Sequence, residues 1–99
     1  MVYRLYIGSD NGTHTVSDAQ EQKINEILAD AFESFTYHRA TGVFREQREE
    51  TIIITIANVP KSDVVAVAEK LREEFDQDGV GIETAGTYER VTTNGLGNS

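Results

Sequence analysis

The stretch Phe35–Ile56 reads FTYHRATGVFREQREETIIITI, and the rest of the chain can be arranged around it. Both of its ends are rich in β-branched and aromatic residues, which favour strands. They flank a charged segment at residues 45–50. In the second half, Ile52 and Ile54 alternate with residues that would point to the opposite face. The stretch therefore predicts two long antiparallel strands joined by a charged tip.

The segment before this hairpin predicts a strand, a loop and a helix. Residues 2–8 alternate in the manner of a half-buried strand, and residues 9–16 are dense in turn-forming residues. Ser17 and Gln20 have the spacing of a capping box. An apolar stripe with helical periodicity follows, and it predicts a helix that ends near Glu33.

The segment after the hairpin predicts a second helix and a fourth strand. Pro60 or Ser62 opens a stretch in which apolar residues recur with helical spacing. Residues 80–84 then alternate as a strand does. Residues 86–91 are interpreted as an extension of that strand after a kink, and residues 92–99 as a flexible tail.

The predicted element order is β-α-β-β-α-β, which is typical of a ferredoxin-like sandwich. We therefore expect an α+β fold with a four-stranded antiparallel sheet and two helices on one face. The single domain would span residues 1–91. Two separate hairpins with packed helices are the alternative, and the single buried stripe of each helix disfavours it.

Composition restricts the class of partner. The 99 residues fit one domain, and 17 acidic against 9 basic residues give a net charge of −8. This charge opposes binding to nucleic acid and to anionic membranes. The absence of cysteine excludes disulfides, thiolate metal sites and cysteine nucleophiles. No apolar run approaches the roughly 20 residues of a membrane span, and the start does not resemble a signal peptide. We expect a cytoplasmic protein.

One edge of the predicted sheet is a candidate ligand site. The loop at residues 9–16, the start of the first helix, the hairpin tip and the start of the last strand would meet there. Free amides at a helix start and arginine side chains bind anions such as nucleotide phosphates. The candidate residues are Ser9, Asn11, Thr13, His14, Arg45 and Arg48. The competing interpretation is that the two arginines only pair with neighbouring glutamates and keep the hairpin soluble.

Other chemistries find little support in the sequence. Asp10, His14 and Asp18 offer metal ligands, but their spacing matches no known coordinating loop. No Ser-His-Asp arrangement, glycine-rich phosphate loop or helical His-Glu pair can be assembled. We therefore assign no catalytic residue, no metal and no cofactor, and the interpretation leans towards a protein that is not an enzyme.

The face of the sheet that points away from the helices is a candidate interface. Its predicted residues are Tyr6, Thr51, Ile53 and Thr55. An RNA-recognition domain carries stacking aromatic residues on the same two strands, whereas the third strand here offers threonine and isoleucine. A mixed face of this kind favours self-association, and we expect a homo-oligomer.

Three segments carry a family resemblance. The runs Gly42–Glu50, Ile52–Ile56 and Phe75–Val80 resemble a family of small uncharacterised bacterial and phage proteins. The resemblance extends over residues 35–82 and implies the ferredoxin-like fold. It implies no activity.

These observations lead to three functional hypotheses. The first is a non-enzymatic oligomeric protein that binds a small anionic ligand such as a nucleotide. A virus or mobile element could use such a protein to sequester a host signalling nucleotide. The second is a protein–protein interaction module or inhibitor that acts through its acidic surfaces. The third is a small dimeric enzyme with a site between sheet and helices.

Overall fold

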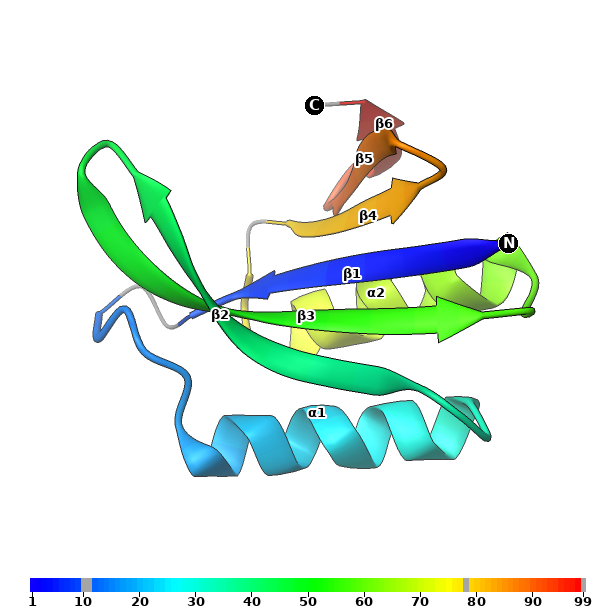
Figure 1. Ribbon diagram of the computed structural model, residues 1–99, viewed down its shortest axis with the longest axis horizontal. Helices are drawn as coiled ribbons and strands as arrows, with labels where there is room; N and C mark the ends of the chain where they lie inside the picture. Colours follow the sequence, from blue (N-terminus) through cyan, green and yellow to red (C-terminus); the bar gives the residue numbers. More distant parts are fainter. Residues whose placement is uncertain (10–11, 78, 99) are drawn as a thin grey trace.

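The computed structural model describes residues 1–9, 12–77 and 79–98. These residues form two helices and one sheet, with both helices on the same side of the sheet (Figure 1). In chain order the elements are β1 (Val2–Gly8), α1 (Asp18–Ala31), β2 (Thr36–Phe44), β3 (Gln47–Ala57), α2 (Lys61–Glu74), β4 (Val80–Thr84), β5 (Thr87–Thr92) and β6 (Gly95–Asn98).

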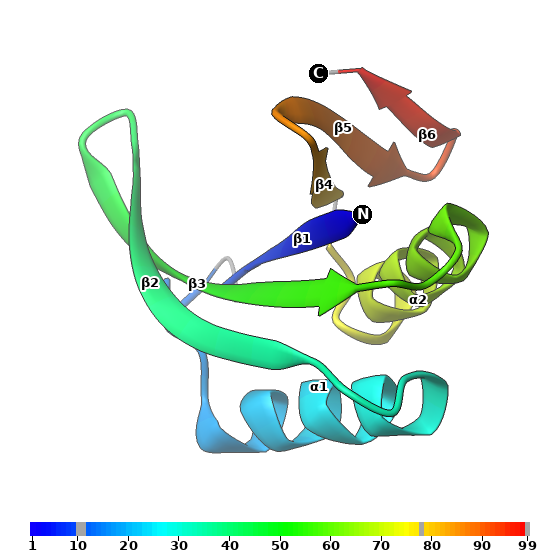
Figure 2. The same cartoon turned by 45° about the vertical axis from the view of Figure 1, so that its right-hand side comes forward.

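The sheet has six strands in the order β2-β3-β1-β4-β5-β6, and every neighbouring pair is antiparallel. The chain is an α+β protein, and its element order up to Thr84 is the predicted one. The prediction of a four-stranded, ferredoxin-like sandwich is wrong, because β5 and β6 extend the sheet beyond β4. In Figure 2 these added strands curve over the side of the molecule where α2 lies.

Two tight reversals account for the added strands. Ala85 and Gly86 both have positive φ, at 50° and 85°, and Thr84 pairs with Thr87 across them. Such a two-residue turn returns the chain alongside β4, where the sequence pattern suggested that one strand continued. A second reversal precedes Gly95, whose φ is 92°. The segment predicted as a flexible tail therefore contains β6, which pairs with β5.

The core lies between the helices and one face of the sheet. Its residues alternate along the strands and recur with helical spacing along α1 and α2, as the sequence predicted. The largest fully buried side chains are Leu5, Ile7, Leu28, Ile52, Ile54, Ile56, Leu71, Ile82, Val64, Val80 and Val91. The capping box is also confirmed, because Ser17 Oγ accepts from Gln20 N at 3.1 Å and Gln20 Oε1 accepts from Ser17 N at 3.0 Å.

The β2–β3 hairpin extends beyond the helices and β1 (Figures 1 and 2). Phe44 pairs with Gln47, so the tip is a two-residue turn at Arg45 and Glu46 and not a loop over residues 45–50. Both turn residues have positive φ, at 49° and 67°. None of the helices in the described part of the chain is long and apolar enough to cross a membrane.

Candidate functional site

The face of the sheet opposite the helices carries a groove above β1, β3, β4 and β5. Side chains alternate along a strand, so the residues next to the buried ones in sequence point to this face. The groove, called the open-face groove below, has a volume of about 460 Å³. Its lining residues are Tyr6, Gly8, Ser9, Glu49, Thr51, Gln77, Gly79, Gly81, Tyr88 and Arg90.

Two glycines of the groove make room for two large side chains from β5. A Cβ atom on Gly81 would lie 2.1 Å from the hydroxyl oxygen of Tyr88, and one on Gly79 would lie 2.6 Å from Nε of Arg90. Gly81 pairs with Arg90 across the ladder, so each β5 side chain leans diagonally over a residue two positions away from its partner. Any side chain at either glycine would displace the residue above it.

The two tyrosines of the groove contact each other. The ring centroids of Tyr6 and Tyr88 are 5.9 Å apart, and the ring planes meet at 60°, which is an edge-to-face arrangement. Tyr6 Oη donates a hydrogen bond to Glu83 Oε1 at 2.5 Å. This bond, then burial and the negative charge of Glu83, raise the pKa of Tyr6. Tyr6 is therefore a neutral phenol at physiological pH, with its hydroxyl bonded to Glu83 and its ring beside Tyr88.

The opposite end of the groove is polar. Ser9 is only 5% exposed, and its Oγ has no hydrogen-bond partner among the described residues. Gln77 Nε2 donates to the carbonyl oxygen of Ser9 at 3.3 Å. Arg90 forms no ion pair with any side chain in residues 1–9, 12–77 and 79–98. The groove thus combines an aromatic end with an end that offers a hydroxyl, an amide and a guanidinium, and the carboxylate of Glu49 also belongs to its lining.

A second cavity lies between the loop before α1 and the β2–β3 hairpin. This loop–hairpin hollow has a volume of about 360 Å³. Its lining residues are Thr13, His14, Thr15, Thr41, Gln47, Arg48, Glu49 and Glu50. Glu49 lines both cavities, so they adjoin at this side chain.

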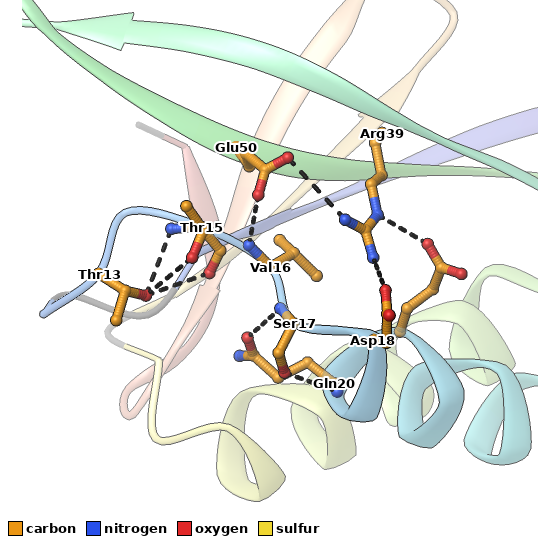
Figure 3. A network of polar contacts seen from close by, with 9 residues as sticks. Thr13, Thr15, Val16, Ser17, Asp18, Gln20, Arg39 and Glu50 are labelled. Carbon is orange, nitrogen blue, oxygen red and sulfur yellow. Dashed lines mark hydrogen bonds and ion pairs between the residues drawn. The ribbon is translucent and has the colours of Figure 1, made fainter.

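Glu50 connects the loop before α1 to β3 through hydrogen bonds, and Figure 3 shows the one from its side chain. Its Oε1 accepts a hydrogen bond from the backbone N–H of Val16 at 2.8 Å. Its own backbone N–H donates to the carbonyl oxygen of His14 at 3.0 Å. His14 Nδ1 lies 3.5 Å from Glu49 Oε1, a distance that gives an ion pair when the imidazole is protonated. The hollow therefore has a wall that is held by its own polar contacts.

Arg39 joins β2 to the start of α1. Its Nε donates to Glu21 Oε1 at 2.8 Å and its Nη2 to Asp18 Oδ1 at 3.1 Å. Its Nη1 is 4.0 Å from Glu50 Oε2. Carboxylates at the first turn of a helix also favour its positive end. This cluster is a structural connection between helix and hairpin.

The six predicted ligand residues do not lie around one cavity. Thr13, His14 and Arg48 line the loop–hairpin hollow, whereas Ser9 lines the open-face groove. Arg45 is at the hairpin turn and lines neither cavity. The prediction for Asn11 lies outside the described residues. The hollow also contains Glu49 and Glu50, which oppose an anionic guest.

The other predicted surfaces can be located as well. Asp10, one of three metal candidates, lies outside the described residues; His14 faces Glu49 and Asp18 pairs with Arg39. Within the described ranges, no group of three or more metal-ligating side chains comes together. The predicted interface residues Tyr6, Thr51, Ile53 and Thr55 are all partly exposed on the open face, and the first two line the groove. Self-association through them stays a prediction.

Sequence reasoning missed Gly81 of β4, Tyr88 and Arg90 of β5, and Gly79, which lies directly before β4. The signal was a pair of alternations, Gly79-x-Gly81 followed by Tyr88-x-Arg90. Two glycines with a spacing of two on one strand can accept two long side chains from the next strand. This pattern is informative only when the turn between the strands is recognised.

Comparison with solved structures finds the same fold in a phage SAM lyase, where SAM denotes S-adenosylmethionine. The lyase in its apo state aligns with a TM-score of 0.58 and 21% identity, covering 93% of this chain and 88% of the lyase chain. The lyase in complex with S-methyl-5'-thioadenosine aligns with a TM-score of 0.53 and 23% identity, covering 94% and 89%. No family model and no curated protein sequence matches the chain. The likeness establishes a shared fold.

Proposed function

We propose that this chain binds S-adenosylmethionine in the open-face groove and cleaves it to S-methyl-5'-thioadenosine. The observation that carries the proposal is the composition of the groove. Tyr6 and Tyr88 contact each other at one end, Glu83 accepts a hydrogen bond from Tyr6, and Arg90 lies at the other end of a groove that Glu49 also lines. The fold shared with a phage SAM lyase supports the same ligand class.

The charges of the groove match this ligand better than a purely anionic nucleotide. S-adenosylmethionine carries a sulfonium cation, and aromatic faces and carboxylates attract cations. Glu49 lines the groove, and Glu83 is hydrogen-bonded to Tyr6. The net charge of −8 also favours the approach of a cation over that of an anion. The adenine ring can stack on an exposed tyrosine, and Tyr88 is 44% exposed.

The reaction needs no external cofactor. The bond between sulfur and the γ-carbon of the amino-acid chain breaks, and its electron pair stays on sulfur, which becomes a neutral thioether. The four-carbon fragment completes its valence when its own carboxylate attacks the γ-carbon, which gives a lactone, or when it loses a β-proton, which gives an unsaturated amino acid. Both routes balance without water. The contribution of the groove would be to hold the flexible chain in a reactive geometry.

Sequestration of the nucleoside without cleavage is the second candidate function. The observation that favours it is the state of Tyr6, whose proton is engaged with Glu83 and whose pKa is raised. A phenol in this state contributes to binding and not to proton abstraction. A phage or another mobile element could use such a protein to withhold a signalling nucleoside from its host.

Incubation of the purified protein with S-adenosylmethionine tests both candidates. Chromatography would follow S-methyl-5'-thioadenosine, with a sample that lacks protein to correct for spontaneous breakdown, and NMR would identify the four-carbon fragment. We expect protein-dependent product, and a loss of about ten- to hundredfold for Tyr88→Ala, because a stacking contact is removed. Arg48→Ala, in the loop–hairpin hollow, should retain activity. Binding in calorimetry without product would support sequestration, and absence of both would overturn the proposal.

A further inference from the structure

The two ends of the open-face groove differ chemically, and the proposed function does not say which end of the ligand binds at which end of the groove. Gly79 directly precedes β4 and Gly81 is its second residue, so the groups above the two glycines are separated by about 7 Å along the direction of β4. The guanidinium of Arg90 is over the first glycine and the hydroxyl of Tyr88 is over the second. A ligand that extends along β4 therefore meets an aromatic group at one end and a cation at the other.

Arg90 is suited to accept a carboxylate. Its guanidinium lies against Gly79, where no side chain intervenes, and its end faces the groove that it lines. Arg90 forms no ion pair with side chains in residues 1–9, 12–77 and 79–98. Its guanidinium has the planar fork that binds a carboxylate through two hydrogen bonds. Arg48 and Arg90 are both exposed, and Glu49 lines both cavities; the hollow around Arg48 contains a second glutamate, Glu50, which the groove lacks.

Ser9 gives an independent indication that a polar group belongs at this end. Its side chain is almost fully buried, lines the same groove, and lacks a hydrogen-bond partner in the described part of the chain. Buried hydroxyls are normally satisfied, so an unsatisfied one at a cavity wall indicates a position for a ligand atom. Gln77, which contacts the Ser9 carbonyl, brings a side-chain amide to the same place.

We propose that Arg90, positioned by Gly79, binds the carboxylate of the ligand's amino-acid chain, and that the groove thereby selects nucleosides that carry this chain. The inference rests on the proposed function and assigns the two ends of the ligand. The chain from sulfur to the carboxylate carbon has four bonds of about 1.5 Å or slightly more, which allows a reach of about 5 Å. That length places the carboxylate within hydrogen-bonding distance of Arg90 when the sulfur lies beside Tyr88.

Two ligands without a sulfonium group, which the protein therefore cannot cleave, can be used to measure this contact separately from the rest of the site. S-adenosylhomocysteine has the amino-acid chain, and S-methyl-5'-thioadenosine lacks it. Calorimetry should show tighter binding of the first by the wild-type protein. Arg90→Gln should weaken binding of the first ligand by about ten- to hundredfold, the usual cost of a hydrogen bond to a charged group. Binding of the second ligand should stay within about twofold.

Substitutions at Gly79 and Gly97 test whether Gly79 positions the side chain of Arg90. Gly79→Ala should reproduce the Arg90→Gln effect, because its Cβ would displace the guanidinium. Gly97→Ala is the matched control, since Gly97 pairs with Arg90 on β6 and its Cβ would meet nothing within 4 Å. Arg90→Lys should give an intermediate affinity, because a lysine keeps the charge without the fork. Thermal melts would verify folding, and Arg90→Gln carries the test if Gly79→Ala fails to fold.

The outcomes separate this inference from the function on which it rests. Selective weakening of S-adenosylhomocysteine by Arg90→Gln supports it. Equal weakening of both ligands, an unchanged affinity for both, or no wild-type preference for the longer ligand overturns the role of Arg90 and leaves the groove as the binding site. Binding of neither ligand by the wild-type protein overturns the proposed function and this inference together.

Discussion

The two ends of the sheet differ in sequence signal and in chemical content. The β2–β3 hairpin has strands of 9 and 11 residues, and polar contacts of Arg39 and Glu50 join it to the helix side. The ribbon β4–β5–β6 has strands of 5, 6 and 4 residues, yet it brings Tyr88 and Arg90 over two glycines. The strong strand pattern belongs to the framework, and the weak one belongs to the candidate site.

The largest expected effect compares one substitution at both ends. Val91 of β5 is fully buried, whereas Val43 near the hairpin tip is 67% exposed. Val91→Ala should lower the free energy of unfolding by about 2 kcal/mol, because it removes buried methyl groups and leaves a cavity. Val43→Ala should change it by less than about 0.5 kcal/mol. Urea unfolding would measure both, and equal effects would mean that the ribbon is not part of the core.

The next effect concerns the attachment of the loop to the hairpin. Glu50→Ala should destabilise the protein by about 1–2 kcal/mol, because the buried N–H of Val16 loses its acceptor. Glu50→Gln is the matched variant, since its amide oxygen can still accept this bond, and it should retain most of the stability. Thermal melts would compare the two. If both variants were equally stable, the contact between Glu50 and Val16 would have no energetic role.

A smaller effect of opposite sign is expected at the hairpin tip. Arg45 and Glu46 both have positive φ, a conformation that suits Asn and Gly far better than arginine and glutamate. The double substitution Arg45→Asn with Glu46→Gly should raise the free energy of unfolding by about 1 kcal/mol. Its affinity for groove ligands should not change. Destabilisation in urea unfolding would show that contacts of the native tip outweigh the backbone strain.

The smallest effect is a pH dependence at the groove. The pKa of Tyr6 is raised above 10.0 in the folded state by its bond to Glu83. The folded protein therefore holds this proton more tightly, and the contribution is fully present below pH 10 and is lost as the pH rises through the folded-state pKa. Tyr6→Phe should remove this loss from stability measured between pH 9 and pH 12. An unchanged pH profile in the variant would contradict the bond.

The sequence predicted β1, both helices and the hairpin because their apolar residues recur with the regular spacing of strands and helices. The alternation of β1, the apolar stripes of both helices and the capping box at Ser17 are all confirmed. The reversal at Ala85 and Gly86 was missed, because alanine gives no turn signal and residues on both sides favour strands. With that turn unrecognised, Tyr88 and Arg90 could not be placed over Gly81 and Gly79.

The candidate site could be predicted only in part for the same reason. Ser9 was selected for its position after β1, and it lines the groove. The arginines of the hairpin were selected for their charge. Charge does not indicate to which face of the sheet each side chain points. Which cavity a side chain reaches depends on register and diagonal packing across neighbouring strands, and these follow from turns and not from composition.

Residue-resolved NMR gives the most direct test of the claim that the open-face groove is the ligand site. S-methyl-5'-thioadenosine would be titrated into ¹⁵N-labelled protein. We expect saturable shifts of the backbone amides of Gly79 and Gly81, whereas those of Thr13 and Thr15 in the loop–hairpin hollow should stay unchanged. Saturable shifts confined to the hollow, or no shift at either cavity, would contradict it.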